Sequence, residues 1–141
     1  MQATYPARVA ELPDDVRALL EAPNFAHLAT VLPDGSPHTV PVWVGFEDGR
    51  IAFFTQPSSR KARNLARDPR VAISIVDRAN PYLMAQIRGR VAGTLEGDEA
   101  LVVIDRLSQR YIGEDFPMRS GVVFLIEPER AFSMDLPFRE R

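Results

Sequence analysis

The 141-residue chain, 45% hydrophobic and 26% charged, is long enough for one domain with a substantial core and too short for two. The absence of cysteine excludes disulfides, thiolate metal sites and cysteine nucleophiles, and a net charge of −2 disfavours nucleic acid as the main partner. No apolar run is long enough to cross a bilayer, and residues 1–11 lack a signal-peptide pattern. We therefore expect a cytoplasmic protein with a single domain over residues 1–141.

The first part of the chain predicts one short helix followed by three strands. Residues 13–22 have the apolar spacing of an amphipathic helix. Strands are expected at residues 25–32, 37–46 and 51–55, joined by turn signals at residues 33–36 and 47–50. Proline cannot donate a backbone hydrogen bond, so Pro37 and Pro41 indicate that the second strand lies at a sheet edge or carries a bulge.

The stretch over residues 55–70 predicts a short helix with a phosphate site at its start. Its opening carries two serines and three cations: Ser58, Ser59, Arg60, Lys61 and Arg63. The start of a helix has partial positive charge, so cations there are unfavourable unless an anion lies among them. Free backbone N–H groups, hydroxyls and cations together are typical of a phosphate site. The alternative is a solvated helix whose long side chains point away from its own terminus.

Lysine usage draws attention to the same helix. Of the 17 basic residues, Lys61 is the only lysine. A coding bias toward arginine explains this as chance. The functional alternative is that this position needs a compact ammonium, which a guanidinium cannot replace.

The second part of the chain predicts three more strands and one helix. The strands are expected at residues 71–76, 82–95 and 122–127, with residues 132–134 as a candidate continuation of the last. Gly89 and Gly93 indicate bending or close packing within the long strand. A helix near residues 98–112 ends at Gly113. Six strands joined by hairpins and long returns predict a mainly β protein, a six-stranded antiparallel barrel.

The sequence contains no self-sufficient catalytic motif. It has no Gly-x-Ser-x-Gly elbow, no dinucleotide-binding glycine pattern and no carboxylate cluster. Counting from the turn at residues 34–35 sets His38 opposite Val31 and His27 opposite Val42. The only two histidines are then not neighbours, and no metal site is expected.

The second hairpin brings an aromatic segment to the phosphate helix. Counting from residues 48–49 sets Trp43 opposite Phe54 and Val42 opposite Thr55. Residues 41–44 then lie beside the strand that leads into the helix. This arrangement suits a planar aromatic cofactor with its phosphate at the helix start, although Trp43 is equally well explained as a core aromatic.

Several motifs resemble those of one known superfamily. The segments Ser59-Arg60-Lys61-Ala62-Arg63-Asn64-Leu65 and Asp68-Pro69-Arg70-Val71-Ala72 resemble the flavin-phosphate motif of the pyridoxamine 5′-phosphate oxidase-like split barrels. The segments at residues 25–30, 33–37, 41–43, 80–82, 87–91 and 104–111 are similar to the coenzyme F420-dependent (class B) branch. Together these pieces cover about residues 10–132.

The resemblance implies a six-stranded split barrel that forms a homodimer, with each cofactor in a groove between two subunits. It implies cofactor-phosphate contacts at Ser59, Arg60, Lys61 and Asn64. It implies contacts with the cofactor ring at Thr55, Pro41, Val42 and Trp43. Gln86 and Arg88 of the long strand are expected to face the groove from the partner subunit. No catalytic side chain is implied.

The implied function is an oxidoreductase that transfers a hydride between coenzyme F420 and a small unsaturated or electron-poor molecule. The alternatives are an FMN-dependent oxidoreductase of the same fold and a non-catalytic flavin- or deazaflavin-binding carrier. Vitamin B6 oxidation is disfavoured, because the Arg- and His-bearing C-terminal segment of pyridoxamine phosphate oxidases is lacking. The phosphate motif suits FMN as well as F420, whereas Arg63, Arg67 and Arg70 offer cations for the polyglutamate tail of F420. The sequence does not identify the substrate.

Overall fold

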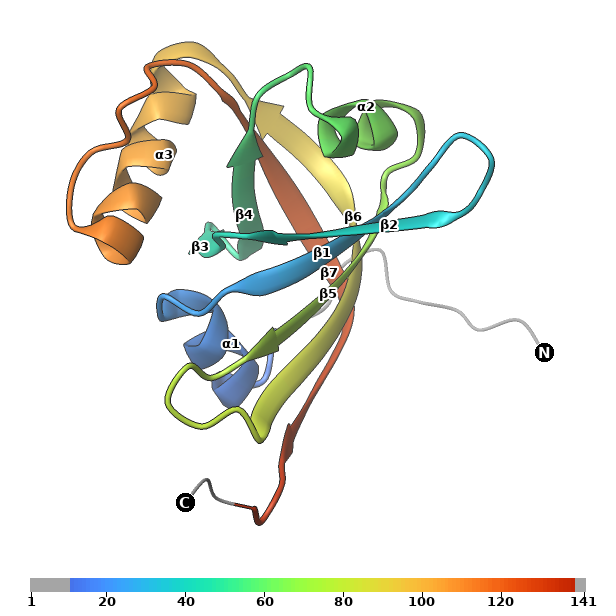
Figure 1. Cartoon of the computed structure of the whole chain (residues 1–141), viewed down its shortest axis with the longest axis vertical. Coiled ribbons are helices and arrows are strands. Elements are labelled where there is room, and N and C mark those ends of the chain that lie inside the picture. Colours follow the sequence, from blue (N-terminus) through green and yellow to red (C-terminus); the bar gives the residue numbers. More distant parts are fainter. Residues whose placement is uncertain (1–10, 139–141) are drawn as a thin grey trace.

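The computed structural model describes residues 11–138, which form three helices and seven strands (Figure 1). The helices are α1 (Asp14–Glu21), α2 (Arg60–Arg67) and α3 (Gly97–Ile112). The strands are β1 (Ala26–Val31), β2 (Pro37–Val42), β3 (Gly45–Glu47), β4 (Arg50–Thr55), β5 (Arg70–Val76), β6 (Leu83–Leu95) and β7 (Val122–Asp135). Within these residues, no helix has the length and apolar character needed to cross a membrane.

All seven strands form one antiparallel sheet in the order β2-β1-β5-β6-β7-β4-β3. The mainly β, antiparallel prediction is confirmed, but the predicted count of six strands is wrong. The strand expected over residues 37–46 divides into β2 and β3, which lie at opposite edges of the sheet. The division has a local cause, because the Val44 backbone N–H donates to the Tyr111 hydroxyl at 3.1 Å instead of to a neighbouring strand.

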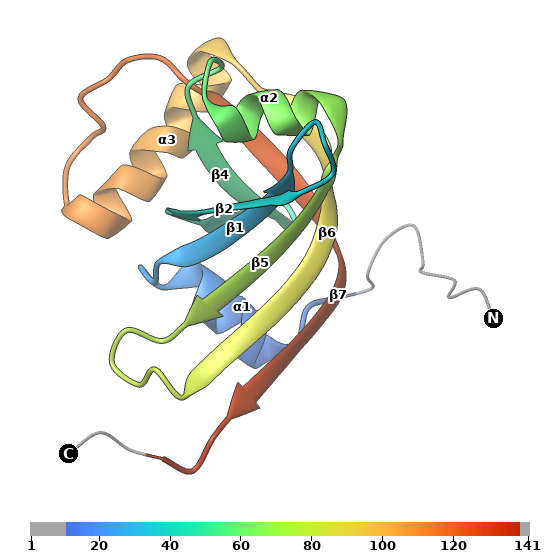
Figure 2. The ribbon, with the colours of Figure 1, turned by 45° about the vertical axis from the view of Figure 1, so that its right-hand side comes forward.

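The two edge strands of the sheet, β2 and β3, follow one another directly in the chain. Pro37 and Pro41 lie in the edge strand β2, as predicted for residues that cannot donate to a ladder. Within residues 11–138 no ladder joins β2 to β3, so the two edges are linked by the chain at residues 43–44 and not by strand pairing. Figure 2 shows the long strands β5, β6 and β7 running side by side and curving together.

The predicted bend in the long strand is present at both glycines. The register between β6 and β7 shifts between Arg88 and Gly89 and again between Val91 and Gly93. Such bulges increase the local twist of a sheet. The continuation of the last strand through residues 132–134 is also confirmed, since β7 runs unbroken to Asp135.

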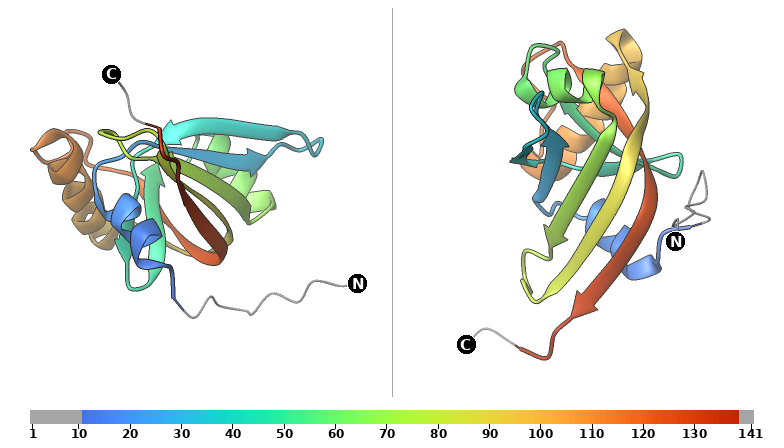
Figure 3. Two further views of the ribbon diagram at one scale, coloured as in Figure 1. Left: turned by 90° about the horizontal axis from the view of Figure 1, so that it is seen from below. Right: turned by 90° about the vertical axis from the view of Figure 1, so that its right-hand side faces the viewer.

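The core has two parts, one on each side of β4. The inner part combines Val16, Leu19 and Leu20 of α1 with apolar side chains from the surrounding strands and from α2. The second part packs α3 against Ala52 of β4 and Val123 of β7. The right-hand view of Figure 3 shows α1 and α2 toward opposite ends of the sheet.

The first hairpin is shifted by one residue from its predicted register. The observed pairs are Thr30 with His38 and His27 with Pro41, where Val31 and Val42 were expected. The turn is centred on residue 34, because the Leu32 N–H bonds to the Ser36 carbonyl at 2.8 Å. His27 is exposed, whereas His38 is half-buried and opposite the buried Thr30, so the histidines lie on opposite faces of the sheet.

Candidate cofactor site

The start of α2 has the local structure that the sequence predicts. Ser59 is the N-cap, and its hydroxyl oxygen accepts from the Ala62 N–H at 3.2 Å and from the Thr55 hydroxyl at 2.9 Å. The first turn contains no acidic residue, and Arg60 is exposed. Among the described residues, no carboxylate forms an ion pair with Arg60 or Lys61. The helix start is therefore positively charged and uncompensated.

Asn64 holds α2 against the sheet. Its side chain is fully buried, and its amide nitrogen donates to the Thr30 hydroxyl of β1 at 3.0 Å. Asn64 therefore joins α2 to β1. The contact with a cofactor phosphate that the resemblance implies for it stays a prediction.

An aromatic pocket of about 320 Å³ opens beside the start of α2. Its lining residues are Phe25, Pro41, Val42, Trp43, Phe54, Lys61 and Phe116. The structure thus places Pro41, Val42 and Trp43, which were expected to contact the cofactor ring, in one cavity. Lys61, which was expected to contact the cofactor phosphate, lines the same cavity. Thr55 lies behind this wall, buried and bonded to Ser59. We call this cavity the aromatic pocket.

Trp43 is held in place by other aromatic rings. It stacks on Tyr111 with a centroid distance of 5.1 Å and an interplanar angle of 7°. It meets Phe54 and Phe116 edge to face, each with a centroid distance of 6.0 Å. The contact with Phe54 agrees with the register predicted for the second hairpin. Trp43 is therefore both a packed aromatic and a pocket wall, and the two interpretations of it are compatible.

Tyr111 fixes the backbone next to Trp43. Its hydroxyl donates to the Asn24 carbonyl at 2.5 Å while accepting from the Val44 N–H. Burial raises the pKa of Tyr111, so this hydroxyl stays protonated at neutral pH. The segment that forms one wall of the aromatic pocket is thus tied to α3 and to the end of α1.

The loop between α3 and β7 supplies the outer wall. The Phe116 N–H donates to Asp105 at 3.2 Å, and Arg119 donates to both oxygens of the same carboxylate at 2.8 and 2.9 Å. These bonds, with that from Arg119 the strongest, lower the pKa of Asp105. Gln56 holds the far end of the loop by donating to the Ser120 carbonyl at 2.8 Å. The sequence analysis did not single out Phe116.

Lys61 is the only charged side chain among the lining residues of the aromatic pocket. It is half-buried, and burial lowers the pKa of its ammonium group. Its exposed neighbours on the same helix, Arg60 and Arg63, do not line the pocket.

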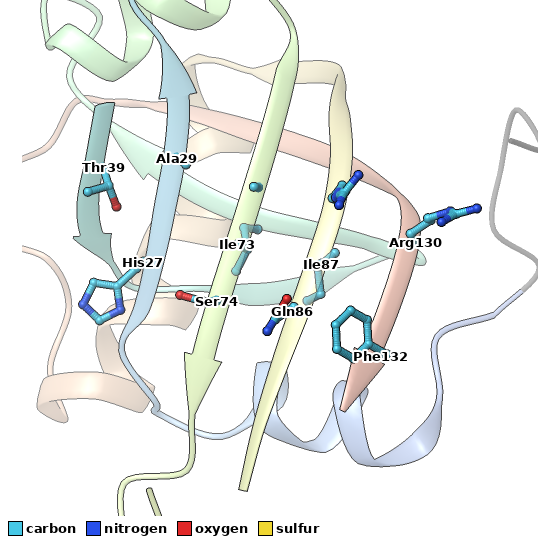
Figure 4. A pocket seen from close by; sticks show the side chains of 11 residues that line it. His27, Ala29, Thr39, Ile73, Ser74, Gln86, Ile87, Arg130 and Phe132 are labelled. Carbon is cyan, nitrogen blue, oxygen red and sulfur yellow. The ribbon is translucent and has the colours of Figure 1, made fainter. Parts of the chain in front are cut away.

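Gln86 and Arg88 lie in a different pocket, on the outer face of the sheet (Figure 4). This second pocket also has a volume of about 320 Å³ and includes His27, Ser74, Arg130 and Phe132 in its lining. We call it the outer pocket. It adjoins the aromatic pocket, because His27 of the outer pocket is directly opposite Pro41 of the aromatic pocket. The described chain does not bring Gln86 or Arg88 to Lys61, so their expected contact with a cofactor requires a second copy of the chain.

Comparison with known proteins identifies the family. The pyridoxamine 5′-phosphate oxidase family profile matches residues 12–135, and the chain belongs to this family. A curated relative, the pyridoxine/pyridoxamine 5′-phosphate oxidase of Bacteroides thetaiotaomicron, is 38% identical over 66 residues. That match covers 46% of this chain and 31% of the relative, so the chain spans about a third of the length of this protein.

Two solved structures are similar over most of their length. An F420 reductase has 30% sequence identity and a TM-score of 0.76, with coverage of 86% of this chain and 98% of its own. A conserved hypothetical protein of Mycobacterium tuberculosis has 27% identity and a TM-score of 0.74, with coverage of 99% and 97%. The chain thus shares its overall fold with both proteins.

Proposed function

We propose that this protein is an oxidoreductase that uses coenzyme F420 to transfer a hydride to a small unsaturated or electron-poor molecule. The observation that carries this proposal is the aromatic pocket, which adjoins a positively charged helix start. A flat ring suits the aromatic walls, and a phosphate suits the free N–H groups and cations. The similarity to an F420 reductase along nearly its whole length supports the same choice.

The described residues fit such a cofactor in a specific way. Ser58, Ser59 and Arg60, with the backbone N–H groups of the first turn of α2, would hold the phosphate. The wall from Pro41 to Trp43 would orient the ring, and Phe116 would exclude water from it. The bound deazaflavin would supply the hydride chemistry, while the protein provides binding and orientation.

Coenzyme F420 and FMN differ in the tail beyond the phosphate. Of the three arginines considered for a polyglutamate tail, Arg70 is paired with Asp68 at 2.7 Å and Arg67 donates to the Val31 carbonyl. Arg63 is exposed and has no ion-pair partner among the described residues. The surface thus offers less free positive charge than the sequence suggests, and FMN remains the alternative cofactor.

We also propose that the chain forms a homodimer through the outer face of its sheet. Four large apolar side chains are exposed there or at its rim, with exposed fractions of 44% for Phe25, 39% for Val76, 52% for Phe132 and 39% for Met134. Burying them against a second copy would bring its outer pocket toward the neighbouring aromatic pocket. Light scattering at micromolar concentration checks this: a monomer that still binds cofactor would contradict it.

The proposed cofactor is tested by titrating cofactor-free protein with FMN and with coenzyme F420 side by side. The proposal expects tighter binding of F420, and turnover of F420H2 with at least one acceptor from a panel of enones, quinones and nitroaromatics. Preferential binding of FMN would select the alternative cofactor. Binding of F420 without turnover of any acceptor would indicate a carrier, and turnover of pyridoxamine 5′-phosphate would indicate vitamin B6 oxidation.

A further inference from the structure

Helix α2 also forms one wall of a cavity that shares no lining residue with the aromatic pocket. This cavity has a volume of about 270 Å³. Its lining residues are Pro57, Ala62, Leu65 and Ala66 in and before α2, Val91, Thr94 and Glu96 at the end of β6, and Val122 and Phe124 at the start of β7. We call it the α2–β6 groove. The proposed function makes no use of it.

A bulge in β6 decides which of its side chains face this groove. Val91 pairs with Ile126 of the inner part of the core, and Thr94 pairs with Phe124 of the same part. These positions are three residues apart on β6 but two apart on β7, because the register shifts between them. Residues that pair across a ladder lie on the same face of a sheet. The bulge therefore turns Thr94 toward the inner part of the core, where regular alternation would have turned it away.

Glu96 lies on the same face as Thr94. Its backbone is extended, with φ of −133° and ψ of 168°, so the alternation of the strand continues through this residue. Glu96 is the only charged residue among the described residues that line the groove. It is exposed, and within residues 11–138 it forms no ion pair. One carboxylate with no cationic partner in this range thus borders the groove.

The walls of the groove are apolar and are held by the core. Ala62, Leu65, Val122 and Phe124 are all buried. Phe124 stacks on Phe53 with a centroid distance of 5.2 Å and an interplanar angle of 11°. The floor is therefore fixed, while the rim carries one hydroxyl and one carboxylate. Apolar walls with a few placed polar groups are typical of sites for small molecules.

The ordinary explanation of Glu96 is that a carboxylate stabilises the start of α3. Asp98 and Glu99 already supply negative charge in the first turn of that helix. Glu96 is the N-cap residue, but its side chain accepts no hydrogen bond from the helix. Capping therefore does not explain why a carboxylate borders the groove.

We propose that the α2–β6 groove is a second ligand site, which binds a small primary amine with an apolar body. The apolar body contacts Leu65 and Phe124, and the ammonium group donates to the Glu96 carboxylate and the Thr94 hydroxyl. A cavity of about 150 Å³ holds benzene, so the larger volume here accommodates a phenyl ring with a short alkyl chain. This site is separate from the aromatic pocket and does not depend on the proposed function.

The first test measures selectivity on the full chain without cofactor. The probe is 3-phenylpropylamine, and 3-phenylpropanol is its neutral counterpart. Titration calorimetry should give a dissociation constant below about 1 mM for the amine, which has about ten non-hydrogen atoms. The alcohol should bind at least about fivefold more weakly, because it forms no charge-assisted hydrogen bond with Glu96.

The second test locates the bound amine by NMR. Nuclear Overhauser contacts are expected between its phenyl protons and the methyl groups of Leu65 and Val122, which line the groove. No such contact is expected with the indole of Trp43, which lines the aromatic pocket. Contacts with Trp43 alone would place the amine in the aromatic pocket and overturn the proposal.

Glu96→Gln and Glu99→Gln separate specific recognition from general attraction of a cation. Each variant removes one exposed carboxylate near the start of α3, but only Glu96 lines the groove. Glu96→Gln should raise the dissociation constant of the amine at least about fivefold and leave that of the alcohol within about twofold. Glu99→Gln should match the native protein for both molecules.

Ala66→Phe blocks the groove, because it places a phenyl ring where the ligand would lie. It should abolish the calorimetric signal of the amine, with thermal melts as the control for folding. The proposal is wrong if this folded variant binds the amine as tightly as the native protein does. It is also wrong if the amine and the alcohol bind equally, or if the two glutamate variants behave alike. Should Ala66→Phe not fold, the glutamate pair still decides, and none of these results depends on flavin, deazaflavin or turnover.

Discussion

Replacing Gly89 by alanine tests how tightly β6 and β7 are packed at their bulge. A Cβ atom at this position would lie 2.4 Å from the Glu127 carbonyl oxygen and 3.0 Å from Cγ2 of Ile126. The first contact is with backbone, so rotation of a side chain does not relieve it. Forced overpacking of a core costs about 1–3 kcal/mol, and a backbone clash belongs at the upper end of that range. For a domain of this size, about 3 kcal/mol lowers Tm by roughly 10 °C.

Gly93 provides a matched control on the same strand and at the neighbouring register shift. A Cβ atom there meets no heavy atom within 4 Å. Gly93→Ala should therefore change the free energy of unfolding by less than about 0.5 kcal/mol. Urea denaturation followed by circular dichroism, with thermal melts, measures both variants. Equal stabilities of Gly89→Ala and Gly93→Ala would refute the reasoning, because only the close approach of β7 distinguishes the two positions.

Three further predictions concern the surroundings of the aromatic pocket. Asn64→Ala removes the buried bond to Thr30 and should reduce the free energy of unfolding by about 1–3 kcal/mol in urea denaturation, with a native value contradicting the role of Asn64. Tyr111→Phe leaves the Val44 N–H without its partner and should shift the fluorescence of Trp43, the only tryptophan, whereas Tyr82→Phe should leave that spectrum unchanged. The pKa of Asp105 is lowered in the folded state, so its contribution to stability is present above about pH 4, the unfolded value, and is lost as the pH falls through the folded pKa. Asp105→Asn should remove that part of the acid dependence measured by thermal melts between pH 2 and 7, and an unchanged dependence would contradict it.

The positions of the strands along the chain follow from local signals, whereas the closest contacts within the sheet do not. Prolines, turn residues and β-branched runs located nearly every strand within a residue or two. Gly89 and Gly93 look alike in the sequence, and only the first lies against backbone. The strand over residues 37–46 was predicted unbroken, because the competing partner of the Val44 N–H is a hydroxyl from α3, far along the chain.

The candidate site was predicted in part. The cations and hydroxyls at the start of α2 are visible in the sequence, and the second hairpin brought residues 41–43 beside them. Phe25 and Phe116 were missed as pocket walls, since an aromatic residue at a strand end or in a loop gives no periodic signal. Asn64 was expected to contact the cofactor phosphate, because the resemblance implies it. Only its bond to Thr30 reveals that it faces the sheet.

The aromatic pocket forms where the strand predicted over residues 37–46 is interrupted. Continuous pairing through residues 37–46 would have kept Trp43 within a regular strand. The Val44 N–H donates to the Tyr111 hydroxyl instead of to a neighbouring strand, and β2 ends at Val42. The ring of the same tyrosine stacks on Trp43. The indole then becomes a wall that Phe54, Phe116 and Lys61 complete. Departures from local preference are expected at functional or strained sites. The interruption between β2 and β3 is thus the structural feature on which the proposed hydride-transfer site depends.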